Sequence, residues 1–186
     1  MEFIGHLWLP IVLATVIAFV ASSIVWMAGP HHKKEFTPVP DGDGLQAFLR
    51  KAGVGPGGYM FPHGDRSDKA AWAEAMKKYA EGPSGLLYVA PKGAMNMGAM
   101  MGKQLLFFLF TNVCLAFLGW HAGLDHTTYR HVFGIIGTAA FMAYFFAAIP
   151  ESIWFGRPWR NLWMGGIDAL FYALLTAGTF GWLWPR

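Results

Sequence analysis

Apolar residues are concentrated in four long runs, which cover residues 4–28, 105–123, 132–149 and 162–184. Each run is close to the roughly 20 residues that an α-helix needs to cross about 30 Å of hydrocarbon. A segment surrounded by lipid must satisfy its own backbone hydrogen bonds, so these runs are predicted to be helices. We therefore expect an all-α integral membrane protein with four transmembrane helices. Residues 29–104 are expected to form a small, partly helical extramembrane insertion between the first two.

Composition supports this class, because 55% of the 186 residues are hydrophobic and only 13% are charged. A soluble domain usually carries about a quarter charged residues. Most of the tryptophans fall near the ends of the predicted spans, where amphipathic rings sit at headgroup depth. Glu2 and His6 stand where a cleaved signal peptide would carry positive charge, so the first run is expected to be a retained span.

Lysine and arginine near the span ends set the expected orientation. Residues 29–104 and 150–161 carry six of these charges near the spans, whereas the opposite side carries only Arg130 and Arg186. The positive-inside rule then makes the first side cytoplasmic and both termini periplasmic. The net charge of +3 is small and unevenly distributed, so no nucleic-acid partner is expected.

The insertion is predicted to contain two helices and a strand. One helix covers residues 45–52 with Asp43 as its N-cap, and a second covers residues 68–80 with Ser67 as its cap. Residues 53–64 are rich in turn formers, and residues 85–91 are a strand candidate that could pair with residues 35–40. A piece this small builds little core of its own, so it is expected to pack on the membrane domain or on a partner.

Four methionines, Met95, Met97, Met100 and Met101, precede the second span. Thioethers can bind copper(I), but they also fill irregular apolar gaps. No histidine or cysteine lies nearby, and the segment is predicted to be cytoplasmic, so we favour a hydrophobic hinge. The basic stretch HHKKE at residues 31–35 suggests contact with anionic lipid.

Histidines also gather at the opposite membrane face. Imidazole and carboxylate groups suit zinc, iron or copper, and histidine could ligate heme. The sequence requires no cofactor, and solvated headgroup contacts are the alternative. A heme or metal site at this face would use His6, His121, Asp125, His126 and His131.

Polar residues inside the predicted spans are the strongest functional signal. Asp168 lies about 9 Å inside the fourth span by helical rise, and a carboxylate at that depth is usually paired and often functional. An ion relay, a small-ligand site and a hydrogen-bonded layer that fixes helix register are the alternatives. The predicted polar layer comprises Ser22, Ser23, Asn112, Tyr144, Asp168 and Tyr172, with Glu151, Arg157 and Arg160 at its cytoplasmic mouth.

Small residues recur every four positions in the fourth span, which lets a neighbouring helix approach closely. The neighbour could belong to this chain or to another membrane subunit. The predicted packing face comprises Gly165, Ala169, Ala173, Ala177 and Gly181.

Phosphate-loop, dinucleotide-binding, zincin and GxSxG motifs are absent from the sequence. Four segments, QAFLRKAGVGPGGYMFP, NMG, IPESIWFGRPW and DALFYALLTAGTFGWLWP, together resemble an uncharacterised group of bacterial membrane proteins with this span layout. The resemblance implies a bacterial inner membrane and no particular activity. Met95, Met100 and Met101 depart from the group's pattern, which further disfavours copper.

The sequence is compatible with three functions. The first is a non-catalytic accessory subunit of a larger membrane complex, favoured by the packing faces, the small insertion and the lack of a catalytic motif. The second is a heme- or metal-binding redox protein that uses the outer histidines. The third is a small transporter or proton relay centred on Asp168.

Overall fold

The computed structural model describes residues 2–124 and 127–185, and the chain within them divides into two compact units. The first unit contains the residues up to Phe36 and those from Asn96 onward. The second unit covers Thr37–Met95.

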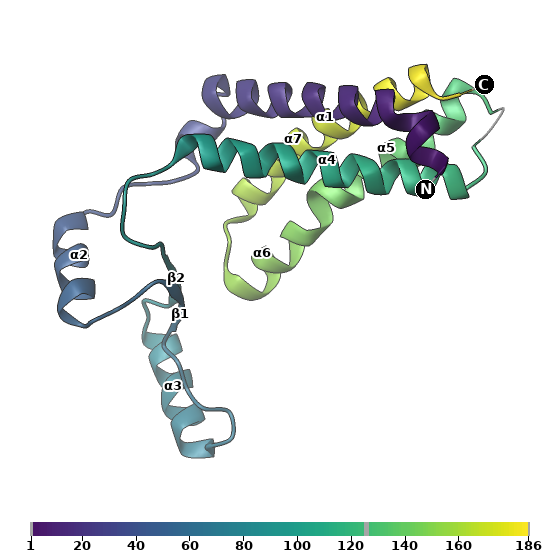
Figure 1. Ribbon diagram of the computed structural model, residues 1–186. Coiled ribbons are helices and arrows are strands. Elements are labelled where there is room, and N and C mark those ends of the chain that lie inside the picture. The colour runs from purple at the N-terminus through teal and green to yellow at the C-terminus, as the bar shows by residue number, and fades with distance from the viewer. Residues whose placement is uncertain (1, 125–126, 186) are drawn as a thin grey trace. The chain divides into compact units, whose positions relative to one another are not determined.

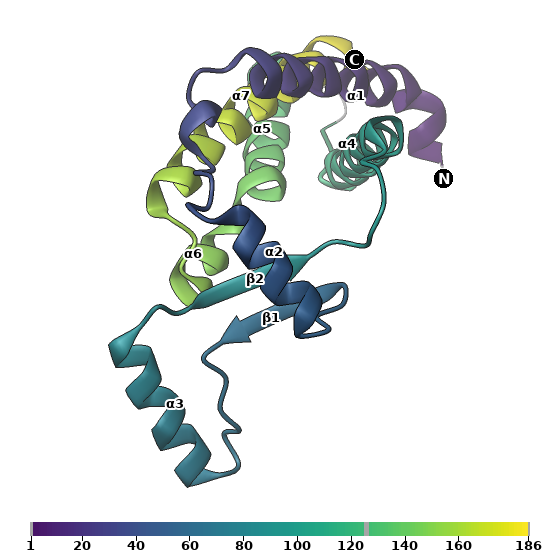
Figure 2. The same cartoon turned by 90° about the vertical axis from the view of Figure 1, so that its left-hand side faces the viewer.

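The first unit is a bundle of four long helices (Figures 1 and 2). They are α1 (Glu2–Ala28), α4 (Met97–His121), α5 (Tyr129–Phe145) and α7 (Trp159–Leu183). Within the described residues, four helical segments are long and apolar enough to cross a membrane, the third running from Tyr129 to Phe155. The fold is consistent with a multi-pass membrane protein.

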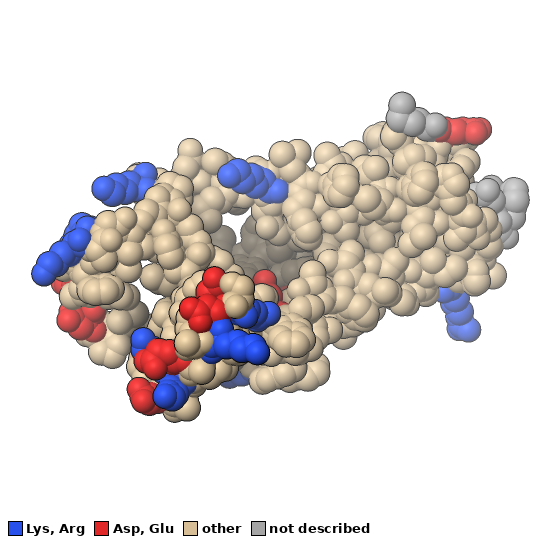
Figure 3. Space-filling view, turned by 90° about the horizontal axis from the view of Figure 1, so that it is seen from below, with Lys and Arg blue, Asp and Glu red and all other residues tan. Residues whose placement is uncertain are grey.

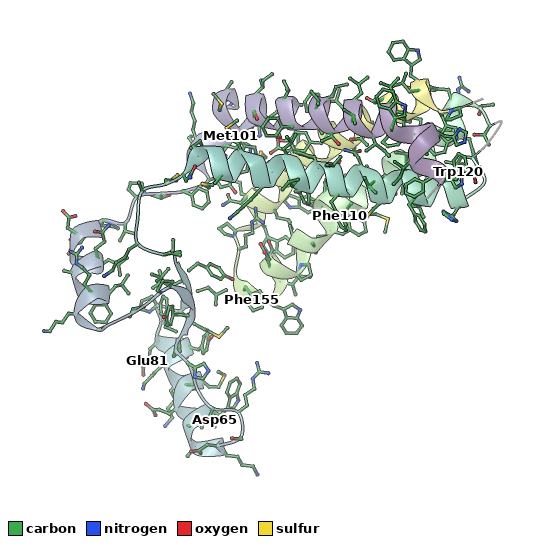
Figure 4. The ribbon with its side chains drawn as sticks, viewed as in Figure 1. Asp65, Glu81, Met101, Phe110, Trp120 and Phe155 are labelled. Carbon is green, nitrogen blue, oxygen red and sulfur yellow. The ribbon has the colours of Figure 1, made fainter. Side chains whose placement is uncertain are left out.

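Helices α4 and α5 extend furthest beyond the predicted spans. Helix α4 begins at Met97, where the Asn96 side chain accepts a hydrogen bond from the Ala99 amide, so Met97, Met100 and Met101 lie in its first turns. Figure 4 shows Met101 at this end of α4. Helix α5 continues through the 3-10 turn η2 (Phe146–Ala148) into α6 (Ile149–Phe155), where a loop was predicted. Gly156, in the left-handed conformation, ends α6.

Helix α7 is the most buried of the four and packs along both α1 and α5. Small residues make this approach possible: the Ala177 side chain faces Gly137 of α5, and Gly181 leaves room for the Tyr129 ring. Ala169 and Ala173 are also buried, whereas Gly165 is only half-buried with open space beside it. Most of the predicted packing face therefore meets helices of this chain.

The second unit contains α2 (Gly42–Lys51), β1 (Gly57–Phe61), α3 (Lys69–Glu81) and β2 (Gly85–Val89). Strands β1 and β2 pair antiparallel, with Tyr59 opposite Leu87, so the chain is not all-α. The predicted pairing of residues 85–91 with residues 35–40 is wrong, since the partner strand lies in the glycine-rich stretch that was expected to form turns.

Both predicted caps of this unit are also wrong. Asp41 caps α2 by accepting a hydrogen bond from the Gly44 amide, and Asp68 caps α3 by accepting from the Ala70 and Ala71 amides. In each case an aspartate next to the predicted start competes with the expected residue, and local hydrogen bonding selects it.

Charged side chains are sparse on the bundle. The face seen in Figure 3 is almost entirely uncharged along the helices. Many large apolar side chains of the bundle point outward, and Phe110 of α4 is an example (Figure 4). Exposed apolar helix faces of this kind are compatible with contact to lipid acyl chains.

Candidate cation site at Asp168

Asp168 is a buried carboxylate of the bundle. It lies on α7, about 14 Å of helical rise from the start of that helix, and its side chain is 7% exposed. Its neighbours on the same face of α7 at intervals of one turn, Tyr172 and Thr176, are buried as well. An ionised carboxylate in such surroundings requires polar or charged partners.

The partners come from the segment directly after α1. Residues 29–36, here called the strap, leave α1 at Gly29-Pro30 and include the 3-10 turn η1 (His32–Lys34). A Cβ atom on Gly29 would collide with the Val25 carbonyl oxygen and lie 3.0 Å from His31 Cε1. The lack of a side chain at Gly29 therefore allows the strap to turn sharply and to bring His31 close to the bundle.

Two histidines of the strap each approach one oxygen of Asp168. His31 Nε2 donates a hydrogen bond to Asp168 Oδ1 at 2.9 Å. His32 Nε2 lies 2.8 Å from Asp168 Oδ2, but its angle is unsuitable for a hydrogen bond and this buried nitrogen has no other partner. The distance alone would suggest a good ion pair, but the angle shows that His32 Nε2 lacks a hydrogen-bond partner.

A second buried carboxylate orients His32. Glu35 Oε2 accepts a hydrogen bond from His32 Nδ1 at 2.9 Å, and the Glu35 side chain is 8% exposed. With the hydrogen on Nδ1, a neutral His32 would hold the lone pair of Nε2 only 2.8 Å from an oxygen of the Asp168 carboxylate. That contact is repulsive unless a proton or another cation lies between the two atoms.

Residues around α6 and α7 anchor the strap. Asn161 of α7 donates from its side-chain amide to the Glu35 carbonyl oxygen at 3.1 Å. Arg157 reaches Glu35 at 3.6 Å and Glu151 at 3.1 Å. Arg160 Nη2 lies 3.5 Å from the His31 carbonyl oxygen, at the limit for a hydrogen bond. The predicted mouth residues Glu151, Arg157 and Arg160 thus gather around the strap.

Trp26 covers the remaining face of His32. The two rings are stacked with their centroids 4.0 Å apart, and His31 packs against His32 at 4.2 Å. An indole face favours a positively charged neighbour. The stack also restricts the orientation of His32, which keeps Nε2 close to Asp168.

A buried polar stripe continues along α7 beyond Asp168. Tyr144 of α5 contacts the hydroxyl of Thr176 at 3.4 Å, whereas the Tyr172 hydroxyl is buried and has no hydrogen-bond partner. The stripe on α7 comprises Asn161, Asp168, Tyr172, Thr176 and Thr179, all of them buried.

The other predicted layer residues do not join one continuous network. Ser22 and Ser23 both donate to the Phe19 carbonyl oxygen of their own helix. Asn112 of α4 donates to Thr15 of α1 at 3.3 Å and to its own helix at the Phe108 carbonyl oxygen. Asn112 and Thr15 therefore link α4 to α1, separately from the contacts of Asp168.

The outer histidines are arranged differently. His6 stacks on Trp120 with a centroid distance of 5.2 Å, and a ring nitrogen of His121 hydrogen-bonds the Phe117 carbonyl oxygen of its own helix. His131 is exposed on the first turn of α5. Asp125 and His126 lie outside the described residues. Among the described residues, the donors close enough to share one metal ion are His31, His32 and Asp168.

The sequence indicated Asp168, but it did not indicate its partners. The sequence of residues 31–35 suggests a basic segment that contacts lipid, because the histidines are next to two lysines. Two signals pointed the other way: Gly29-Pro30 after the span predicts a reversal, and Glu35 follows His32 at a spacing of one turn. No match to this chain was found among protein-family models, curated proteins or solved structures.

Proposed function

We propose that this chain is a small multi-pass transporter of a bacterial inner membrane, which moves a cation through its helical bundle by way of Asp168. The observation that carries the proposal is the buried carboxylate of Asp168 with two histidines brought to it by a separate segment. Ionisable groups at membrane depth are costly and generally mark ion pathways or relays.

The polar stripe of α7 is long enough to serve such a path. About 27 Å of helical rise separates Asn161 from Thr179, which approaches the thickness of the hydrocarbon layer. The stripe faces the interior of the unit, because its residues are buried, with Asp168 against the strap and Thr176 beside Tyr144 of α5. Threonine and asparagine also occur where membrane helices pack, but a buried carboxylate such as Asp168 is costly for packing alone.

The charge of the site favours a cation over an anion. Asp168 and Glu35 are both buried carboxylates, whereas Arg157, which reaches Glu35, is one-third exposed and also contacts Glu151. We also propose that the strap faces the cytoplasm, because the lysines and arginines that flank the spans lie mainly on its side.

Purified protein in liposomes tests the proposal. Currents are recorded after concentration jumps of Na⁺, K⁺, H⁺, Mg²⁺ and Zn²⁺, with Asp168→Asn as the variant and Asp43→Asn, an exposed carboxylate of the second unit, as its control. We expect at least one cation to give a current that Asp168→Asn lowers at least tenfold and Asp43→Asn leaves intact. Silence for every cation, or an undiminished current in Asp168→Asn, would refute transport.

A second candidate function is that of an accessory subunit, and the second unit favours it. Of its residues only Ala75 is buried, while Phe48, Tyr59, Phe61 and Tyr88 are exposed. Aromatic surfaces of this kind are typical of protein interfaces. Mild-detergent extraction followed by cross-linking and mass spectrometry tests this reading, which a solitary monomer would contradict.

A further inference from the structure

We propose that the cation bound at Asp168 is a divalent first-row transition-metal ion of the zinc or iron(II) type, held by Nε2 of His31, Nε2 of His32 and one oxygen of Asp168. This inference rests on the proposed cation site and names its substrate class. It concerns binding, so it is testable whether or not the ion crosses the bundle.

The three donor atoms are already gathered. They lie within 4.8 Å of one another, and the two contacts between imidazole and carboxylate measure 2.9 and 2.8 Å. An ion with bonds of about 2.0–2.2 Å to nitrogen and oxygen reaches three such atoms after small side-chain rotations. Asp168 comes from α7 and the histidines from the strap, so the fold brings together donors that are distant in sequence.

Glu35 supplies the outer support that a metal-binding histidine needs. A ligating histidine usually donates its other ring nitrogen to a carboxylate, which fixes the tautomer and makes the ring more basic. His32 does this through Nδ1, with Glu35 Oε2 at 2.9 Å. Its Nε2 is then a buried lone pair without a hydrogen-bond partner, and a metal ion would satisfy it.

Charge and access suit a dication. Two buried carboxylates flank His32, and a bound M²⁺ would balance the charge of both while His32 keeps its Nδ1 hydrogen toward Glu35. Whereas His32 and Asp168 are only 7% exposed, the His31 side chain is 27% exposed and gives the ion a route from the surface.

The donor set selects among metals. Magnesium and calcium require shells made mainly of oxygen, and copper(I) prefers sulfur. Two imidazoles and one carboxylate match zinc, iron(II) and cobalt(II), and three protein ligands leave a position open for water or for release of the ion. Such an incomplete shell suits an ion that must leave again.

The experiment measures metal binding by full-length protein in detergent, purified without a polyhistidine tag. Zn²⁺ affinity is obtained by competition with a fluorescent chelator, and Co²⁺ is added separately to record its visible d–d spectrum. The variants are His32→Ala, Asp168→Asn and Glu35→Gln. His121→Ala is the matched control, because this histidine lies elsewhere on the bundle and bonds to its own helix.

We expect one Zn²⁺ per chain and a Co²⁺ spectrum typical of nitrogen and oxygen ligands. His32→Ala and Asp168→Asn should weaken Zn²⁺ binding by at least a hundredfold. Glu35→Gln should weaken it about tenfold, as for other outer supports, while His121→Ala should change nothing. Circular dichroism and size-exclusion profiles show whether each variant is folded. If His32→Ala or Asp168→Asn does not fold, Glu35→Gln still tests the site, because it retains all three ligands.

Two results would overturn the metal assignment: no stoichiometric Zn²⁺ binding, or equal losses in His121→Ala and His32→Ala. A cation current that depends on Asp168, without Zn²⁺ binding, would support the transport proposal and contradict the metal assignment. Tight Zn²⁺ binding without any current would support the metal assignment and contradict the transport proposal.

Discussion

The two ends of the bundle both carry histidines, yet only one of them gathers the described donors around a single point. At the Asp168 end, His31 and His32 converge on one carboxylate, and Glu35 holds the second ring. At the opposite end, His6 stacks on a tryptophan and His121 bonds to its own helix. The difference shows that a buried carboxylate and a reversing segment can bring donors from distant parts of the chain to one point, whereas placement at the same end of the bundle alone does not.

Among the substitutions that test this difference between the two ends, removal of the Asp168 carboxylate should lower the stability most. We expect Asp168→Ala to lower the free energy of unfolding by about 3 kcal/mol, because it leaves His31 and His32 without their shared partner in a buried site. Equilibrium unfolding in mixed detergent micelles measures the change. His131→Ala at the opposite end is the control, and a comparable loss there would show that the two ends do not differ.

Moving the strap without touching a ligand should have the next largest effect. Gly29→Ala introduces a Cβ that collides with the Val25 carbonyl oxygen and crowds His31, so we expect a loss of about 2 kcal/mol and weaker Zn²⁺ binding. Gly134→Ala on α5 is the matched control, since its Cβ would meet open space. Thermal unfolding of the two variants checks this, and equal behaviour would mean that the strap tolerates displacement.

The outer histidines should matter less. His6→Ala removes the stack on Trp120, for which we expect about 1 kcal/mol of lost stability and an unchanged affinity for Zn²⁺. The same chelator competition used for the strap variants measures the affinity. A fall in zinc affinity here would place metal chemistry at the outer face after all.

The exposed arginine should have the smallest effect. Arg157→Gln breaks contacts with Glu35 and Glu151, but the side chain is one-third exposed and screened by water, so we expect about 0.5 kcal/mol. The difference from the unmodified protein should shrink in 0.5 M NaCl when unfolding is repeated there. A loss as large as that of Asp168→Ala would mean that Arg157 is an essential part of the cation site.

Hydropathy was sufficient to locate four long helices, because each apolar run must form its own hydrogen bonds in lipid. Hydropathy misplaced the start of α4 at Met97 and the end of α6 at Phe155. The start of α4 is set by capping, and α5 continues through a further turn into α6. In the second unit, β1 was missed because glycines obscure the alternation typical of a strand. The depth of Asp168 predicted that it needed partners. Their identity depended on the strap's reversal, a tertiary contact across more than a hundred residues.

The burial of Asp168 has a consequence for how the protein is made. Of the four candidate spans, α7 is the least hydropathic, and a carboxylate near the middle of a helix opposes insertion by about 3 kcal/mol. Helix α7 also follows the other three in the chain, so the strap, α1 and α5 are synthesised before it. Insertion of α7 should therefore depend on docking to helices already in the bilayer, and synthesis of α7 alone should leave it largely outside.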